Sequence, residues 1–178
     1  MSVTFSDVFT SAQETFRREP AAADATFSVE SRQTDGLKSA VTVRQFRVDV
    51  DEPAALGGDD TAPNPVEYVL AALASCQEIT YRLYADQLGI PLKNVSVSLS
   101  GDIDLRGFFA VDDGVRPGYN AVKGTVTLDS DADPAELRRL KATVDRHCPV
   151  LDILRQPTPV SLGLEFKNGS VGTAAAQA

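Results

Sequence analysis

The sequence predicts a single α+β domain in which antiparallel sheets pack around long buried helices. Three observations lead to this expectation: segments that alternate apolar and polar residues, two helix starts with the same capping signal, and the order in which the elements follow one another. A chain of 178 residues suits one domain. We expect the order α-β-β-α-β-β-α-β within residues 1–167, followed by a flexible tail at 168–178.

The chain is expected to begin with an amphipathic helix within residues 1–20. Its apolar residues recur at helical spacing, and Pro20 ends the pattern. These residues are Phe5, Val8, Phe9, Ala12 and Phe16. Residues 26–32 and 41–50 then alternate between apolar and polar, and turn-forming residues lie at 33–36 between them. The two alternating segments therefore predict a hairpin.

The central helix has a strong local start signal. Asn64 supplies an N-cap acceptor, Pro65 suits the first helical position, and Glu67 completes a capping box. The helix should continue to Gly89, since glycine readily adopts the left-handed conformation of a C-terminal cap. Its apolar stripe, together with the alanines on its other sides, predicts burial nearly all round.

A second long helix carries the same signal. Asp133 is followed by a proline and, two residues later, a glutamate, and the helix should end before Pro149. Alternation predicts strands over residues 95–105 and 122–128, and a last strand over 160–166. These elements complete the predicted α+β order.

Charge and composition argue against some classes of partner. The chain has 17 basic and 25 acidic residues, a net charge of −8, and its basic residues do not cluster. We therefore expect neither nucleic acid nor a membrane as a partner. No signal peptide and no run of 18 apolar residues appear, so a reducing cytoplasmic location is the default expectation.

The two cysteines are the residues most capable of chemistry. Cys76 lies on the apolar stripe of the central helix, and Cys148 lies at the end of the second long helix, immediately before Pro149. Two cysteines in a cytoplasmic chain are more often catalytic or inert than structural disulfides. Free cysteine also packs readily as a small hydrophobe. The residues alone leave both interpretations open.

The sequence around both cysteines resembles the OsmC/Ohr family. A Gly-Gly pair at 57–58, an Asn-Pro helix start at Asn64 and a cysteine at position 76 match the family's first site. The Cys-Pro pair at Cys148 matches its second site. The resemblance covers residues 25–167, includes the order of the elements, and leaves the N-terminal helix outside.

This resemblance implies a thiol peroxidase that acts on organic hydroperoxides. Cys76 would be the peroxidatic cysteine, and its sulfenic acid would be captured by Cys148, the resolving cysteine, as a disulfide. An external dithiol reductant, a dihydrolipoyl group or a lipoylated protein, would restore both thiols. No bound cofactor and no metal are expected, because two cysteines with His147 give at most three ligands and no zinc spacing.

A thiolate in an apolar helix needs a positive partner, because burial raises the pKa of the thiol. In the family, an arginine pairs with the thiolate and a glutamate orients the arginine. Arg32 best matches the family's arginine, with Arg44 and Arg47 as alternatives on the next strand.

The orienting glutamate departs from the family pattern. The matching position, two residues after Asn64, holds Val66, and Glu67 follows it. Glu67 is also the expected capping-box residue, and nine residues at about 100° each put it opposite Cys76 on one helix. A role beside its own cysteine is therefore not expected, whereas a role across a dimer interface stays open.

The apolar N-terminal and central helices carry more hydrophobic surface than one chain of this size easily covers, so we expect a homodimer. The alternative to a peroxidase is a non-catalytic OsmC-like protein that binds a small apolar ligand or acts as a redox sensor. The valine at position 66 is the observation that keeps this alternative open.

Overall fold

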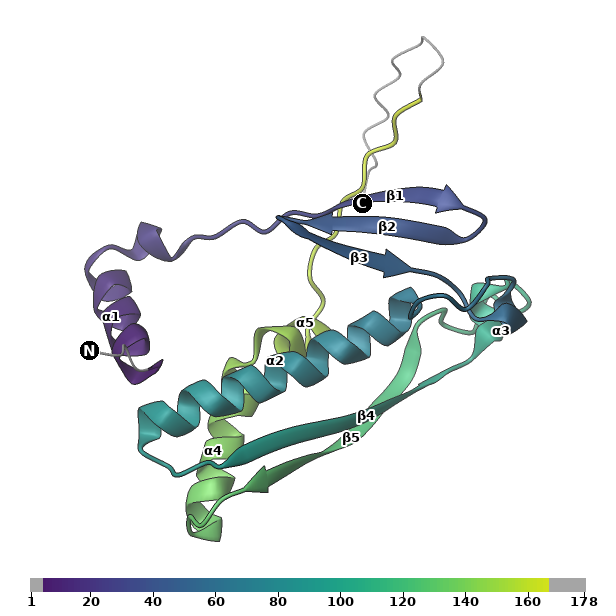
Figure 1. The fold of residues 1–178 in the computed structure, drawn as a ribbon. Helices are drawn as coiled ribbons and strands as arrows, with labels where there is room; N and C mark the ends of the chain where they lie inside the picture. Colours follow the sequence, from purple (N-terminus) through teal and green to yellow (C-terminus); the bar gives the residue numbers. More distant parts are fainter. Residues whose placement is uncertain (1–4, 167–178) are drawn as a thin grey trace.

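The computed structural model describes residues 5–166 and confirms the α+β class (Figure 1). A long helix, α2, runs through the centre, a two-stranded sheet lies on one side of it and a three-stranded sheet on the other. The elements are α1 (Phe5–Arg18), β1 (Glu30–Asp35), β2 (Lys38–Val43), β3 (Phe46–Val50), α2 (Pro65–Leu88), β4 (Asn94–Ile103), α3 (Leu105–Phe108), β5 (Tyr119–Asp129), α4 (Pro134–His147) and α5 (Pro149–Arg155), with short 3-10 turns at Pro20–Ala23 and Ala54–Leu56.

The capping signals give the helix ends correctly. The side chain of Asn64 accepts from the backbone N–H of Glu67 at 2.9 Å, and the Glu67 carboxylate accepts from the N–H of Asn64 at 2.8 Å. Gly89 closes α2 in the left-handed conformation, with φ of 67°. Asp133 and Glu136 form the second capping box at the start of α4. Both long helices are therefore confirmed.

The N-terminal sheet has three strands, whereas two are expected from the sequence. The expected strand 41–50 is wrong as one element, because the chain reverses at Arg44, which has a φ of 55°. Val43 then pairs with Phe46, and β2 and β3 run antiparallel. A non-glycine residue at positive φ is uncommon, and nothing in the local sequence announces it.

The second sheet follows the alternation well. β4 and β5 pair antiparallel from Asn94 opposite Asp129 to Ile103 opposite Tyr119. Alternate residues of β4 are partly buried, and β4 contacts α2. The hydrophobic core lies where the C-terminal half of α2 meets α4 and this sheet, and its buried members are Tyr81, Ala85, Ile90, Leu140 and Val144.

The segment that leads into α2 is built around a buried carboxylate. Asp51 accepts hydrogen bonds from the backbone N–H and hydroxyl of Thr61 and from the N–H of Glu52. These bonds, with the Thr61 N–H foremost, lower the pKa of Asp51 to about 2. Gly58 lies so close to the Glu52 carbonyl that an added Cβ would overlap it. The loop is therefore held in one shape at the start of α2.

Two expectations about burial are wrong for the single chain. α2 is buried only along one face, and its other face leaves Ala71, Ala72, Ser75 and Ile79 exposed. The expected strand over 160–166 pairs with no described strand, and its apolar side chains are 65% to 83% exposed. Within residues 5–166, neither segment has a covering surface. The described residues leave out positions 1–4 and 167 of the expected domain, as well as the expected tail at 168–178.

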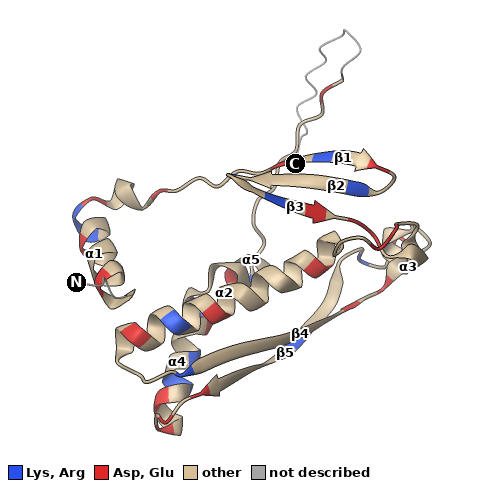
Figure 2. Cartoon of the chain, viewed as in Figure 1, with Lys and Arg blue, Asp and Glu red and all other residues tan. Residues whose placement is uncertain are grey.

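Charged residues of both signs are spread over the described elements (Figure 2). Lys and Arg occur singly or in short groups on several elements, with Asp and Glu between them. Among the described residues, no helix is long and apolar enough to cross a membrane.

Candidate thiol site

The fold brings Cys76 and Cys148 together. Their Sγ atoms lie 3.4 Å apart, although 72 residues separate them in the chain. Cys76 belongs to α2, which contacts both α4 and α5, and Cys148 lies between those two helices. Both are free thiols; Cys76 is partly exposed, whereas Cys148 is 1% exposed. The expected proximity of the two thiols is therefore present in the fold.

Cys148 is fixed by its place between two helices. It is the C-cap of α4 and the N-cap of α5. Its N–H donates to the Val144 carbonyl at 2.9 Å, and its carbonyl accepts from the Asp152 N–H at 3.0 Å. Pro149 ends α4, because proline has no N–H to donate, and suits the first position of α5. The short sulfur distance thus rests on a well-bonded backbone.

Burial raises the pKa of the Cys76 thiol above its ordinary value. The Cys148 thiol raises it further, whereas the backbone N–H of Val150 and the hydroxyl of Thr80 lower it. Thr80 also donates to the Cys76 carbonyl at 2.7 Å. The raising effects prevail, so the net change in the pKa of the Cys76 thiol is upward.

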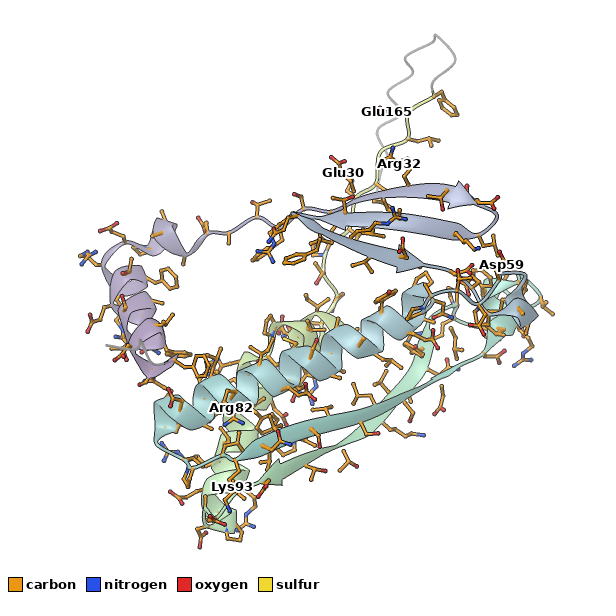
Figure 3. The ribbon with its side chains drawn as sticks, viewed as in Figure 1. Glu30, Arg32, Asp59, Arg82, Lys93 and Glu165 are labelled. Atoms are coloured by element: carbon orange, nitrogen blue, oxygen red, sulfur yellow. The ribbon has the colours of Figure 1, made fainter. Side chains whose placement is uncertain are left out.

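The arginine expected beside Cys76 is not brought there within the chain. Arg32 is exposed on β1, opposite Ala40, and Figure 3 shows it on the sheet far from α2. The alternatives are also engaged elsewhere: Arg44 stacks on the Phe46 ring at 5.2 Å, and Arg47 pairs with Asp49 at 2.8 Å. None of the three contacts Cys76 among the described residues.

Arg82 is the cation of α2 itself, and it too has other partners. Its guanidinium donates to the carbonyls of Leu92 and Lys93, the latter at 3.1 Å, on the turn before β4. Figure 3 shows this group at the C-terminal half of α2. It therefore ties the end of α2 to the start of the second sheet and is not available to the thiols.

Glu67 serves the helix start. Its carboxylate is the acceptor in the capping box, so that interpretation is confirmed. The neighbouring residue Val66 presents its carbonyl to the Tyr119 hydroxyl at 2.9 Å. Burial, with a smaller contribution from the Glu67 charge, raises the pKa of Tyr119. The start of α2 is thus joined to β5, well away from Cys76.

An aromatic stack beside Cys148 was not expected from the sequence. His147 stacks on Tyr84 with ring centroids 5.3 Å apart, and Phe9 of α1 meets the Tyr84 ring edge-on at 5.2 Å. Helical spacing could have suggested it, since Tyr84 lies eight residues after Cys76 on α2. No group of three or more residues suited to hold a metal occurs in the described part of the chain.

Comparison with known proteins identifies the family. The family described as OsmC-like protein matches residues 57–163. No curated protein sequence matches the chain. Among solved structures, an OsmC-like protein from Mycoplasma pneumoniae superposes with a TM-score of 0.66 at 16% identity, covering 75% of this chain and 90% of that one.

Two organic hydroperoxide resistance proteins share the fold. That of Legionella pneumophila has a TM-score of 0.59 and 22% identity over 75% of this chain and 91% of its own. That of Elizabethkingia anophelis has a TM-score of 0.59 and 19% identity over 76% and 91%. Identities this low show a common fold, and the sequence match supplies the family. The chain belongs to the OsmC-like protein family.

Proposed function

We propose that this protein is a two-cysteine thiol peroxidase for organic hydroperoxides. The Cys76 thiolate attacks the outer peroxide oxygen, the O–O bond breaks, and the alkoxide leaves as an alcohol after taking a proton. Cys148 then attacks the resulting sulfenic acid, which forms the disulfide and releases water. A dithiol reductant such as a dihydrolipoyl group reduces the disulfide and is itself oxidised. The observation that carries this proposal is the 3.4 Å approach of the two sulfurs.

The proposal requires a cation that lowers the raised pKa of Cys76. We propose that a second copy of the chain supplies it, with Arg32 as the first choice and Glu67 as a residue that can act across the interface. Large apolar side chains are exposed on both α1 and α2, such as Phe16 at 42% and Ile79 at 60%. These exposed side chains support a homodimer, because association would cover them.

A non-catalytic role is the second candidate. In the single chain the pKa of Cys76 is raised, and no arginine contacts its sulfur among the described residues. A thiol pair with these properties suits a slow redox sensor or a binder of small apolar ligands better than a fast peroxidase.

Titration of free thiols separates these functions. The reduced protein has two thiols, and one equivalent of cumene hydroperoxide should remove both within seconds and yield one intramolecular disulfide. The Cys148→Ser variant should instead accumulate a sulfenic acid on Cys76. Loss of both thiols only over hours would favour the sensor, and two unchanged thiols would refute redox chemistry altogether.

A further inference from the structure

A cavity of about 520 Å³ is lined by Gln77, the residue that follows Cys76 in α2. It opens between α2, the β4–β5 sheet and α5, and its apolar wall includes Leu73, Val97, Leu99 and Leu151. The volume lies within the range of about 300–1,000 Å³ that is usual for small-molecule sites. Neither Cys76 nor Cys148 lines it.

Gln77 gives this cavity a polar group without a partner. The side chain is 6% exposed and lines the cavity, yet its Nε2 donor has no hydrogen bond among the described residues. A buried donor left unpaired costs about 1–3 kcal/mol. The Gln77 amide therefore has a donor to offer to an acceptor that enters the cavity.

The open side of the cavity is basic in an otherwise acidic chain. Arg116, Lys123 and Arg155 line it, against a single carboxylate at Asp145. Lys123 pairs with Asp102 at 3.1 Å, whereas Arg116 and Arg155 form no ion pair with any residue in 5–166. Both arginines are exposed, so they lie towards solvent, and the buried Gln77 lies towards the interior.

We propose that this cavity binds an apolar monocarboxylate that carries a second hydrogen-bond acceptor, such as an ω-hydroxy fatty acid of medium chain length. The carboxylate meets Arg116 and Arg155, the hydrocarbon lies against the leucine and valine wall, and the hydroxyl oxygen accepts from the Gln77 amide. Planar guanidinium groups suit a carboxylate. The site does not depend on thiol chemistry and stands whether or not the protein is a peroxidase.

Calorimetric titration of the reduced full-length protein tests the site. The probes are saturated monocarboxylates of six, eight and ten carbons and their ω-hydroxy forms. We expect micromolar binding of at least one hydroxy acid, about fivefold tighter than its parent acid because one hydrogen bond is gained. Gln77→Leu should abolish that preference and retain binding of the parent acid.

The arginines have a matched control. Replacing Arg116 and Arg155 together by alanine should weaken the binding of the hydroxy acid and of its parent acid by about tenfold. Replacing Arg138 and Arg139 of α4, which do not line the cavity, should leave the binding of both acids unchanged. Absence of binding by all six acids at millimolar concentration overturns the proposal. The proposal is also overturned if light scattering gives Gln77→Leu a different molar mass from the parent, because the cavity would then be an interface between copies.

Discussion

Replacing Tyr84 by leucine should slow disulfide formation without slowing the attack on peroxide. Tyr84 lies between Phe9 of α1 and His147, and His147 directly precedes the buried Cys148. Each aromatic pair contributes about 0.5–1.5 kcal/mol beyond its area, so the loss of two pairs should destabilise the fold by about 1–3 kcal/mol. If about 1 kcal/mol of this holds Cys148 against Cys76, capture of the sulfenic acid slows about fivefold.

The assay resolves the two steps of oxidation. Rapid quenching after addition of cumene hydroperoxide, followed by mass spectrometry, measures the sulfenic acid and the disulfide as functions of time, and urea unfolding measures stability. Phe109→Leu is the control, because it removes a ring pair with Phe108 in α3, far from the thiols. Equal slowing of disulfide formation in both variants would refute the reasoning, as would an unchanged rate in Tyr84→Leu.

Three further predictions address other parts of the fold. Asp51→Asn should lower the urea midpoint at pH 7. In the parent, the stability from this carboxylate is complete above its unfolded pKa of 3.8 and is lost as the pH falls towards about 2, so the variant should lack that part of the decline in stability. Identical pH profiles of stability for the parent and the variant would contradict this. Gly58→Ala should destabilise the protein by about 1–3 kcal/mol because its methyl group overlaps a backbone carbonyl, and an unchanged midpoint would show that the loop yields freely. In a Cys148→Ser background, the alkylation pKa of Cys76 should rise when Arg32 is replaced by alanine; a pKa above 9 in both proteins would argue for the non-catalytic function.

Local signals in the sequence predicted the helix ends, but they predicted neither the turn at Arg44 nor the unpaired state of residues 160–166. The capping boxes at Asn64 and Asp133 act within three residues, so the sequence displays them completely. The turn at Arg44 has no glycine to mark it, and its positive φ is set by the pairing of β2 with β3. Residues 160–166 alternate like a strand, but a strand needs a neighbour that the described chain does not provide.

The candidate site could be predicted only in part, because its contacts join residues that are far apart in the sequence. Proximity of Cys76 and Cys148 depends on the packing of α2 against α4 and α5, so only the family resemblance could suggest it. The unpaired amide of Gln77 could not be foreseen, because a single glutamine on a helix gives no sign of its burial. The cation for Cys76 could not be chosen from the sequence, because several arginines are available and none of Arg32, Arg44 and Arg47 contacts the thiol within the described chain.

In the proposed cycle, the unequal exposure of the two sulfurs would set the direction of thiol exchange. Closing a 3.4 Å gap to a bond of about 2.05 Å needs little movement, so Cys148 would stay buried after oxidation. An incoming thiolate must approach the attacked sulfur along the axis of the S–S bond, opposite the leaving sulfur, and Cys76 is the sulfur with access to solvent. The mixed disulfide with a reductant would therefore form on Cys76, and Cys148 would be the leaving thiol in every cycle.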